Sequence, residues 1–374
     1  MLLPREMLPP DNSPAVWGTR RTVVRRKQLG ETLPPREMLP PDNSPAVWGT
    51  RRTVVRRKQL GETLPPREML PPDNSPAVWG NTADCGPPGA TESKQAWRHT
   101  LKILFLGTSA AEGIPCPFCE CAACTHARET GGRNVRMRTA TLINDDLLFD
   151  CGPDLVAASQ RFGVRLGRVK TMLVTHAHQD HLLPGNLTWR GPDFCPTPLE
   201  HLAIFGPGPV TRAIRRKPHW PILAERGAVS LKTVRAGQRW QSEQYAITAL
   251  PATHSQGETP LLYVVSDGTH KLFYATDSGP LSERAWRIVA REAPFDAVLM
   301  EETMGHGPFW SGHHNVESFL NTHERFVCEG WLTGQARFVA FHFSHHSNPP
   351  HDELVHTFAP YGVLVAYDGM ELTL

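Results

Sequence analysis

The chain has 374 residues, enough for one large domain or two modest ones, and 40% of them are apolar, enough for a sizeable core. The formal net charge of +2 is too small to indicate a nucleic acid or a membrane as a general partner. No apolar run approaches the roughly 18 residues of a membrane span, and the first residues lack the apolar core of a signal peptide, so we expect a soluble, cytoplasmic protein.

The first part of the chain repeats itself. Residues Met7–Glu37 recur letter for letter as Met38–Glu68, and a third copy runs from Met69 to Gly80. Each copy is rich in Pro, Arg and Thr and has no amphipathic stripe for a neighbouring copy to cover. Such a segment does not bury enough apolar surface to offset its ordering entropy. We therefore expect a disordered tail and linker at 1–98 and a folded domain at 99–374.

Most of the elements expected after Leu101 are strands. Apolar runs bounded by turn residues predict strands at 101–107, 139–143, 146–150, 171–175, 202–206, 245–250, 261–267, 271–277, 296–300, 338–342 and 362–368. Helices are expected after Pro153, after His181, after Leu281, and over 315–326 and 351–358. Because strands outnumber helices, the pattern favours an α+β fold with two mixed sheets facing each other and helices outside.

Four of the eight cysteines lie within nine positions, at Cys116, Cys119, Cys121 and Cys124. In a reducing compartment such a cluster indicates a metal site before it indicates disulfides. The spacing alone is equally compatible with a four-cysteine zinc site and with an iron–sulfur site.

The strongest motif in the chain is THAHQDH at 175–181, directly after the mostly apolar run 169–174. In an extended strand exit, His176 and His178 project to the same side. Asp180 and His181 then fall at the turn that follows. The segment can therefore present two imidazoles to one metal ion, and a carboxylate with an imidazole to a second.

One segment cannot complete two coordination spheres, and three further candidates each follow an expected strand. They are His254 in LPATHS, Asp277 in YATDSG and His342 in AFHFSH. Together they supply a third imidazole for one ion, an imidazole for the other, and a carboxylate to bridge the two.

The resulting sets predict a dinuclear centre. They are His176, His178 and His254 on the first ion, Asp180, His181 and His342 on the second, and Asp277 shared between them. Two ions at about 3.5–4 Å can hold a hydroxide between them and clamp the oxygens of an in-line displacement. The sets therefore predict hydrolysis of a phosphoester or an activated carbonyl, with no organic cofactor.

These residues resemble the metallo-β-lactamase fold, an αββα sandwich. The resemblance rests on H-x-H-x-D-H followed by separate His, Asp and His at strand ends, and it covers residues 101–374. It extends to LFDCGPD, where Asp150 looks like the family's acidic residue that orders the ligand loop without binding metal. The resemblance implies a metal-dependent hydrolase with Asp180 among its catalytic residues.

The segments GTSAAEGIPCPFCECAAC, RNVRMRTATLI and FHFSHH resemble the subgroup that contains phosphoribosyl 1,2-cyclic phosphate phosphodiesterase. That subgroup holds a structural zinc through a C-x-C-x2-C cluster and a later histidine. The corresponding residues here are Cys119, Cys121, Cys124 and His345. Cys116 is then an extra thiol, and His346 is an alternative ligand.

The same resemblance gives a catalytic role to His313, two residues before Asn315, which is expected to cap a helix. An imidazole there would stabilise charge on a phosphoryl group or protonate the leaving alkoxide. His314 is the alternative if the match shifts by one residue. Arg138 is the arginine we favour for contact with substrate phosphate.

We therefore expect a dinuclear metal-dependent phosphodiesterase that hydrolyses a small cyclic phosphate or a related phosphodiester through a metal-bridging hydroxide. Its expected cofactors are two catalytic divalent metals, Zn or Mn, and one structural Zn. The alternatives within this fold are an RNA-processing nuclease, a lactonase, or a non-catalytic carrier in cofactor biosynthesis. Residues 101–374 show no basic insertion of the kind that tRNA-processing enzymes use, so a nucleic acid is not the favoured partner. The resemblance adds a homodimer as an expectation.

Overall fold

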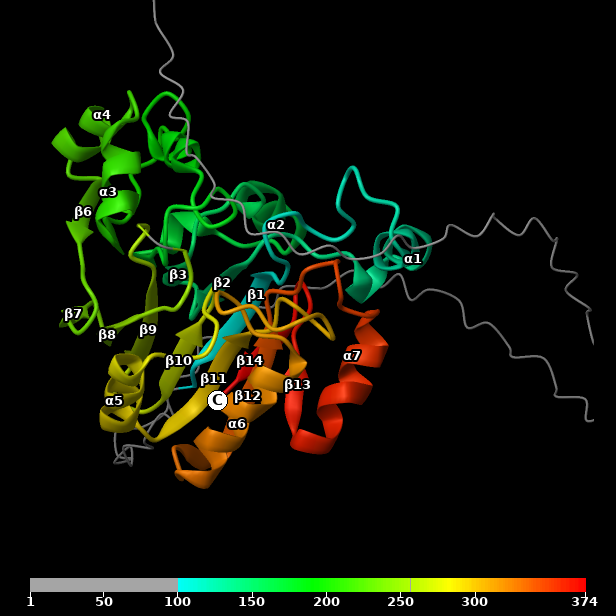
Figure 1. The fold of residues 1–374 in the computed structure, drawn as a ribbon. Helices are drawn as coiled ribbons and strands as arrows, with labels where there is room; N and C mark the ends of the chain where they lie inside the picture. Colours follow the sequence, from blue (N-terminus) through cyan, green and yellow to red (C-terminus); the bar gives the residue numbers. More distant parts are fainter. Residues whose placement is uncertain (1–99, 256) are drawn as a thin grey trace, which may run out of the picture. The chain divides into compact units, whose positions relative to one another are not determined.

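The computed structural model describes residues 100–255 and 257–374, in which two seven-stranded sheets face each other (Figure 1). In spatial order the first sheet contains β14 (Glu371–Thr373), β1 (Lys102–Gly107), β2 (Ala140–Ile143), β3 (Leu147–Phe149), β4 (Thr171–Leu173), β5 (Leu202–Gly206) and β6 (Val229–Thr233). The second contains β13 (Val363–Val365), β12 (Leu332–Phe341), β11 (Phe295–Glu301), β10 (Lys271–Ala275), β9 (Leu261–Ser266), β8 (Tyr245–Pro251) and β7 (Arg239–Ser242).

Each sheet is mixed, with an antiparallel half and a parallel half. In the first sheet the pairs from β14 to β3 are antiparallel and the pairs from β3 to β6 are parallel. In the second sheet the pairs from β13 to β10 are parallel and the pairs from β10 to β7 are antiparallel. The prediction of two mixed sheets is confirmed.

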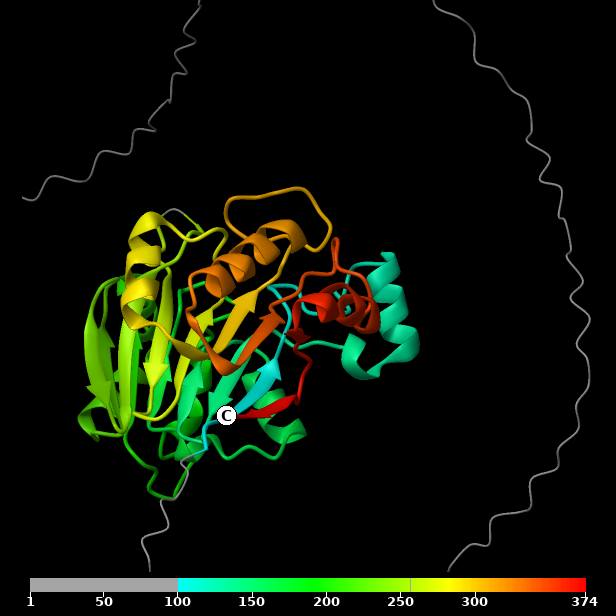
Figure 2. The ribbon, with the colours of Figure 1, turned by 90° about the horizontal axis from the view of Figure 1, so that it is seen from below.

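Helices cover the outer face of each sheet, as the view in Figure 2 also shows. The first sheet packs against α2 (Leu155–Arg161), α3 (Gly208–Arg215) and α4 (Trp220–Glu225). The second sheet packs against α5 (Glu283–Glu292), α6 (Val316–Cys328) and α7 (His351–Phe358). The remaining helical segments are α1 (Ala122–Thr130) and the short 3₁₀ helices η1 (Gly132–Asn134), η2 (Leu166–Arg168), η3 (Pro184–Arg190) and η4 (Ala359–Tyr361).

Three apolar clusters fill the three spaces between these four layers. Strand β10 shows how alternation in the sequence builds two of them. Leu272 and Tyr274 point into the space between the sheets, and Phe273 and Ala275 point toward the helices. Tyr274 stacks on Phe149 of the facing sheet, with ring centroids 4.0 Å apart. The predicted αββα sandwich is therefore confirmed.

The segment after His181 differs from its predicted helix. Pro184 lacks an N–H and disfavours helical backbone at the residue before it, and the chain forms the 3₁₀ helix η3 from Pro184 onward. The expected tail at 1–98 lies outside the described residues. Within the described part, no helix combines the length and the apolar character that crossing a bilayer requires.

Candidate metal centre

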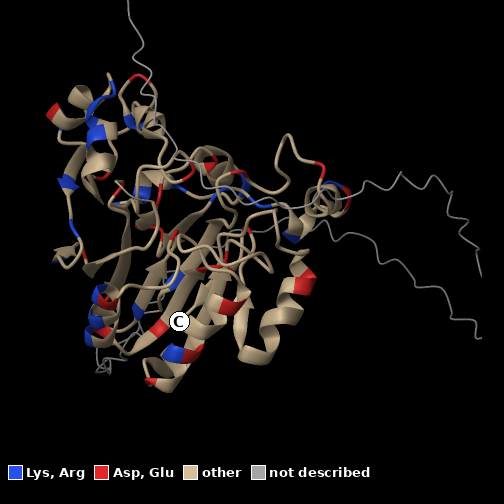
Figure 3. Ribbon diagram, in the orientation of Figure 1, with Lys and Arg blue, Asp and Glu red and all other residues tan. Residues whose placement is uncertain are grey.

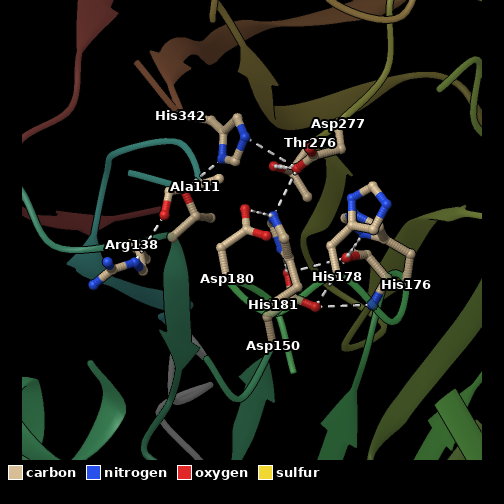
Figure 4. A network of polar contacts seen from close by, with 12 residues as sticks. Ala111, Arg138, Asp150, His176, His178, Asp180, His181, Thr276, Asp277 and His342 are labelled. Carbon is tan, nitrogen blue, oxygen red and sulfur yellow. Dashed lines mark hydrogen bonds and ion pairs between the residues drawn. The ribbon is translucent and has the colours of Figure 1, made fainter. Parts of the chain in front are cut away.

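The seven candidate ligands of the predicted dinuclear centre lie close together, although they come from four separate places in the sequence. Figure 4 labels all of them except His254. THAHQDH follows β4, and His254, Asp277 and His342 follow β8, β10 and β12. The carboxyl ends of these strands meet at one edge of the sandwich. The structure thus brings together every catalytic ligand that the sequence predicts.

The first group contains His176, His178 and His254, whose ligand atoms lie within 4.8 Å of one another. His254 Nε2 is 3.3 Å from His178 Nδ1. His176 is fully buried, and its Nε2 has no hydrogen-bond partner among the described residues. A buried polar atom without a partner is rare, and its place beside two other imidazoles is what a cation site requires.

The second group contains Asp180, His181, Asp277 and His342. His181 Nε2 is 3.0 Å from Asp180 Oδ2 and 2.8 Å from Asp277 Oδ2. His342 Nε2 lies 3.2 Å from the same Asp277 oxygen.

Asp277 connects the two groups. Its Oδ2 faces His181 and His342, and its Oδ1 lies 3.6 Å from His254 Nε2 in the first group. The two oxygens of one carboxylate therefore face two different sets of ligands. This is the arrangement that a carboxylate shared by two cations would adopt.

Hydrogen bonds fix the ring nitrogens that do not face the centre. His181 Nδ1 donates to Asp150 Oδ2 at 2.7 Å, which is the ordering role predicted for Asp150. The Thr139 hydroxyl donates to the Ser109 carbonyl and lies 2.8 Å from His342 Nδ1, so it accepts a hydrogen bond from that nitrogen. Such contacts leave the Nε2 lone pairs of His181 and His342 free to bind a cation.

Three residues at the centre have a strained backbone conformation. Asp150, Asp277 and His342 have φ values of 63°, 51° and 64°, in the left-handed region that non-glycine residues rarely adopt. Such residues cost about 1–3 kcal/mol each and cluster at functional sites. The ligand loop is also held close to its neighbour, because a Cβ at Gly152 would lie 1.9 Å from the Asp180 carbonyl oxygen.

The charges of the centre fit divalent cations. Burial alone would raise the pKa of the Asp180 and Asp277 carboxyls, but the neighbouring His181 and His342 imidazoles lower both pKa values well below the usual range. Two buried carboxylates and five imidazoles in two overlapping groups form a donor set that Zn, Mn and related ions accept.

His313 lies beside the centre and is paired with Glu301, a residue that the sequence analysis missed. His313 Nδ1 is 3.1 Å from Glu301 Oε1, and the His313 and His254 ring centroids are 4.7 Å apart. Burial disfavours the charged imidazole, but the Glu301 carboxylate raises the pKa of His313 to about 9. The loop can approach because Gly279 lacks a Cβ, which would lie 2.1 Å from the Ser311 carbonyl oxygen.

The residues next to this pair have structural roles. Asn315 caps α6 as predicted, and its side chain accepts a hydrogen bond from the Ser318 N–H. His314 is buried against Ser318, and burial lowers its pKa to about 4. Glu302 is also fully buried, and burial together with Glu301 raises its pKa well above the usual range, which favours the neutral acid. His313, rather than His314, is therefore the histidine that contacts the centre.

A second cluster lies at the start of α1. The ligand atoms of Cys119, Cys121, Cys124 and His345 lie within 4.8 Å of one another. Cys121 Sγ is 3.4 Å from His345 Nδ1, and hydrogen bonds from the Cys124 backbone and from His345 outweigh burial and lower the pKa of Cys121 to about 6. This is a donor set for a closed tetrahedral zinc site.

Three other residues considered from the sequence take different places. Among the described residues, Cys116 offers its backbone N–H to Cys124 Sγ at 3.3 Å and its thiol joins no metal-binding group. His346 forms a separate group with Glu112 and His345. Arg138 pairs with Asp154 at 3.0 Å and donates to the Ala111 carbonyl, so its guanidinium is already engaged within the chain (Figure 4).

Comparison with known families agrees with the fold and with the metal-binding groups described above. Residues 146–343 match the family described as "Beta-lactamase superfamily domain". The chain belongs to the beta-lactamase superfamily. This assignment confirms the fold family and the hydrolase class expected from the motifs, and the fold implies that divalent metal is bound.

Individual curated relatives share limited sequence identity with this chain. Ribonuclease BN of Erwinia tasmaniensis is 28% identical over 161 residues, which are 41% of this chain and 46% of that protein. The chain thus spans about half the length of the curated relatives it matches first.

Two solved structures share the fold over most of the described chain. One is a diphosphatase from the PhnP family, with a TM-score of 0.57, 20% identity, and coverage of 74% of this chain and 97% of that one. The other is Zn²⁺-bound PqqB from Methylobacterium extorquens, with a TM-score of 0.58, 18% identity, and coverage of 73% and 100%.

Proposed function

We propose that the chain is a dinuclear metal-dependent phosphodiesterase acting on a small cyclic phosphate or a related phosphodiester. The observation that carries the proposal is Asp277, whose two oxygens face two separate ligand groups beside the His313–Glu301 pair. The similarity in fold to a diphosphatase of the PhnP family supports attack at phosphorus over hydrolysis of a carbon ester.

The ligand groups would hold one divalent ion each. The first ion would take His176, His178 and His254, and the second Asp180, His181 and His342, with Asp277 between them. When bound, such ions supply Lewis acidity to phosphoryl oxygens and make water more acidic. A third ion, a structural zinc, would be held by the cluster of Cys119, Cys121, Cys124 and His345.

His313 would act on the leaving group. The Glu301 carboxylate occupies its Nδ1 and keeps the imidazole charged at neutral pH, so the other ring nitrogen carries a proton to donate. Donation to the departing alkoxide prevents its expulsion as a strong base. Glu301 is the positioning residue, since it also accepts hydrogen bonds from the Ser278 and His314 N–H groups and is itself fixed.

The effect of replacing His313 should depend on the leaving group of the substrate. His313→Ala is expected to lower kcat by about 10²–10⁴-fold on a substrate with an alkoxide leaving group. The loss should be smaller on bis-(p-nitrophenyl) phosphate, whose leaving group departs without protonation. Steady-state kinetics on both esters measure the difference.

The role of Glu301 as the residue that positions His313 can be tested against its neighbour Glu302, which serves as the control. Glu301→Gln should lower kcat and shift the alkaline limb of its pH profile to lower pH, because the charged partner of His313 is lost. Glu302→Gln should behave like the wild type, since burial and the adjacent Glu301 raise the pKa of Glu302 and favour its neutral form. Equal kinetics in the two variants would refute the role given to Glu301.

The proposed function as a whole is tested by turnover on a panel of esters after metal reconstitution. The panel contains bis-(p-nitrophenyl) phosphate, 2′,3′- and 1,2-cyclic phosphates, a lactone and a β-lactam, with His178→Ala as the blank. We expect the wild type to hydrolyse phosphodiesters, and to bind about three metal ions per chain against about one for a carrier with only the structural site. If wild type and blank hydrolyse every ester equally, the assignment fails.

A further inference from the structure

An apolar pocket lies on the outer face of the first sheet, in the layer of helices that covers it. It has a volume of about 320 Å³, and its floor is formed by three neighbouring strands through Leu148 on β3, Met172 on β4 and Leu202 on β5. Neither the seven ligands of the candidate metal centre nor the cysteine cluster contributes a lining residue. We call this cavity the outer pocket.

The walls of the outer pocket come from α2 and from η3, the 3₁₀ helix that follows His181. Val156 on α2 and Trp189 on η3 line the pocket and are 36% and 52% exposed, so the hollow is open to solvent. Close-packed proteins leave few apolar hollows of this size. Sites for small molecules are typically concave and mostly apolar, with a few polar groups. The outer pocket therefore has the character of a site for a small apolar molecule.

One charged side chain lies in the outer pocket. Among the described residues that line it, Arg190 at the end of η3 is the only one with a charge. One of its Nη atoms donates to the Glu200 carbonyl at 2.6 Å, whereas its Nε is buried and has no hydrogen-bond partner within 100–255 and 257–374. In the same part of the chain the ion pairs of arginine with carboxylates are made by Arg128, Arg138, Arg168 and Arg291. Burial lowers the pKa of Arg190, as expected for a charge without a carboxylate partner.

A guanidinium without a counter-ion in an apolar hollow is complementary to a molecule that joins an anionic group to an apolar body. Figure 3 shows Lys and Arg positions interspersed with Asp and Glu positions over the described ribbon, so the attraction for an anion here is local to Arg190. A single guanidinium balances one negative charge, which favours a carboxylate over a phosphate dianion.

We propose that the outer pocket binds a monocarboxylate with an aliphatic tail, of the size of a medium-chain fatty acid. The tail would lie on the apolar floor, and the carboxylate would accept hydrogen bonds from Arg190. Such a site is separate from the candidate metal centre and does not depend on the hydrolysis proposed for it.

Isothermal titration of the full-length protein with decanoate tests the proposal. Decyltrimethylammonium has the same tail with the opposite charge, and acetate has the carboxylate without the tail. We expect a Kd of about 10–100 μM for decanoate, within the range of ligand efficiencies for small molecules. Neither of the other two compounds should bind detectably to the wild type.

Replacing the charge of Arg190 should change which compound binds. Arg190→Met is expected to weaken decanoate binding by about 10–100-fold, the range for a hydrogen bond to a charged group. Arg190→Glu should invert the preference, so that decyltrimethylammonium binds and decanoate does not. Arg165→Met is the matched control, because Arg165 is exposed and does not line the pocket, and it should bind decanoate like the wild type.

Two further measurements locate the bound tail. Ser159→Phe should fill the hollow and abolish decanoate binding, whereas Ala157→Phe, at an exposed position of the same helix that does not line the pocket, should leave it unchanged. Cys195 is a free thiol that lines the pocket, and Cys328 is an exposed thiol on α6. Decanoate should slow the alkylation of Cys195 and not that of Cys328, as measured by mass spectrometry.

The outcomes separate the outer pocket from other places where decanoate could bind. No binding to the wild type, or equal affinity in the wild type and Arg190→Met, overturns the proposal, and equal affinity is also the result expected if the carboxylate binds a metal ion at the candidate centre. If decanoate does not bind and light scattering shows a dimer that Ser159→Phe dissociates, a second copy of the chain covers the pocket through the exposed Trp189 and Phe194, and the proposal is again overturned. All of these readouts measure binding or assembly, so failure of the proposed phosphodiesterase leaves them valid.

Discussion

Asp277→Asn is expected to lower kcat for phosphodiester hydrolysis by about 10³-fold or more, because it alters the carboxylate that faces both ligand groups. Asparagine is the suitable replacement because it tolerates the φ of 51° at this position. Its amide keeps one oxygen but replaces the other with a nitrogen that cannot bind a cation. Turnover of bis-(p-nitrophenyl) phosphate and metal content by mass spectrometry measure the effect.

The loss of activity in Asp277→Asn should come from the metal centre and not from unfolding of the domain. Asp277→Asn should keep the native secondary structure, because the substitution keeps the volume of the side chain. Its Tm should fall by no more than expected from the loss of bound metal and of the pairing with His181 and His342. Asp193→Asn makes the same chemical change at an exposed position away from the ligands and should behave like the wild type. Wild-type turnover and metal content in Asp277→Asn would contradict the idea that one carboxylate serves both groups.

Much of the centre was predictable because one rule located it. Ligands come directly after buried strands, and buried strands are visible in the sequence as short apolar runs. His254, Asp277 and His342 were each weak signals, and the structure places them with THAHQDH because β8, β10 and β12 end at the same edge as β4. The two mixed sheets followed from the same runs.

Glu301 shows that the rule was applied incompletely. It ends the apolar run of β11, in DAVLMEET, as Asp277 follows the run of β10. The sequence therefore contained a signal for the partner of His313, but nothing in it distinguishes Glu301, whose pKa is lowered, from Glu302, whose pKa is raised. That difference comes from the His313 imidazole, which only the fold brings to Glu301.

Other features have no local signal. The positive φ angles of Asp150, Asp277 and His342 are imposed by their surroundings, since none of these residue types requires that conformation. A basic pocket of about 790 Å³, lined by Arg212, Arg215, Arg235 and Arg284, is built from α3, β6, the loop after β8, and α5, and α3 and β6 were not predicted. Their arginines are scattered in the sequence and converge only in space, so a count of basic residues could not find them.

Cys121→Ser is expected to remove one metal ion per chain and to lower the free energy of unfolding by about 4 kcal/mol, the scale of losing a structural metal. For a domain of this size that corresponds to a drop in Tm of about 10 °C. The expected zinc would tie the start of α1 to His345, three residues beyond His342, so its binding energy would act as folding energy. Thermal unfolding with and without a chelator, together with native mass spectrometry, measures both effects.

The choice of serine removes an alternative explanation for such a loss. Cys121 is the N-cap of α1 and its thiol makes no capping hydrogen bond, whereas serine is among the preferred capping residues. Without a metal, Cys121→Ser should therefore leave the helix as stable as before or more stable, and a lower Tm reports the lost ion. Cys116→Ser is the matched control, because Cys116 is also half-buried in this segment and its thiol joins no metal-binding group among the described residues. A chelator should lower the Tm of the wild type and of Cys116→Ser to that of Cys121→Ser, and if all three proteins unfold at one temperature before the chelator is added, the cluster holds no structural metal.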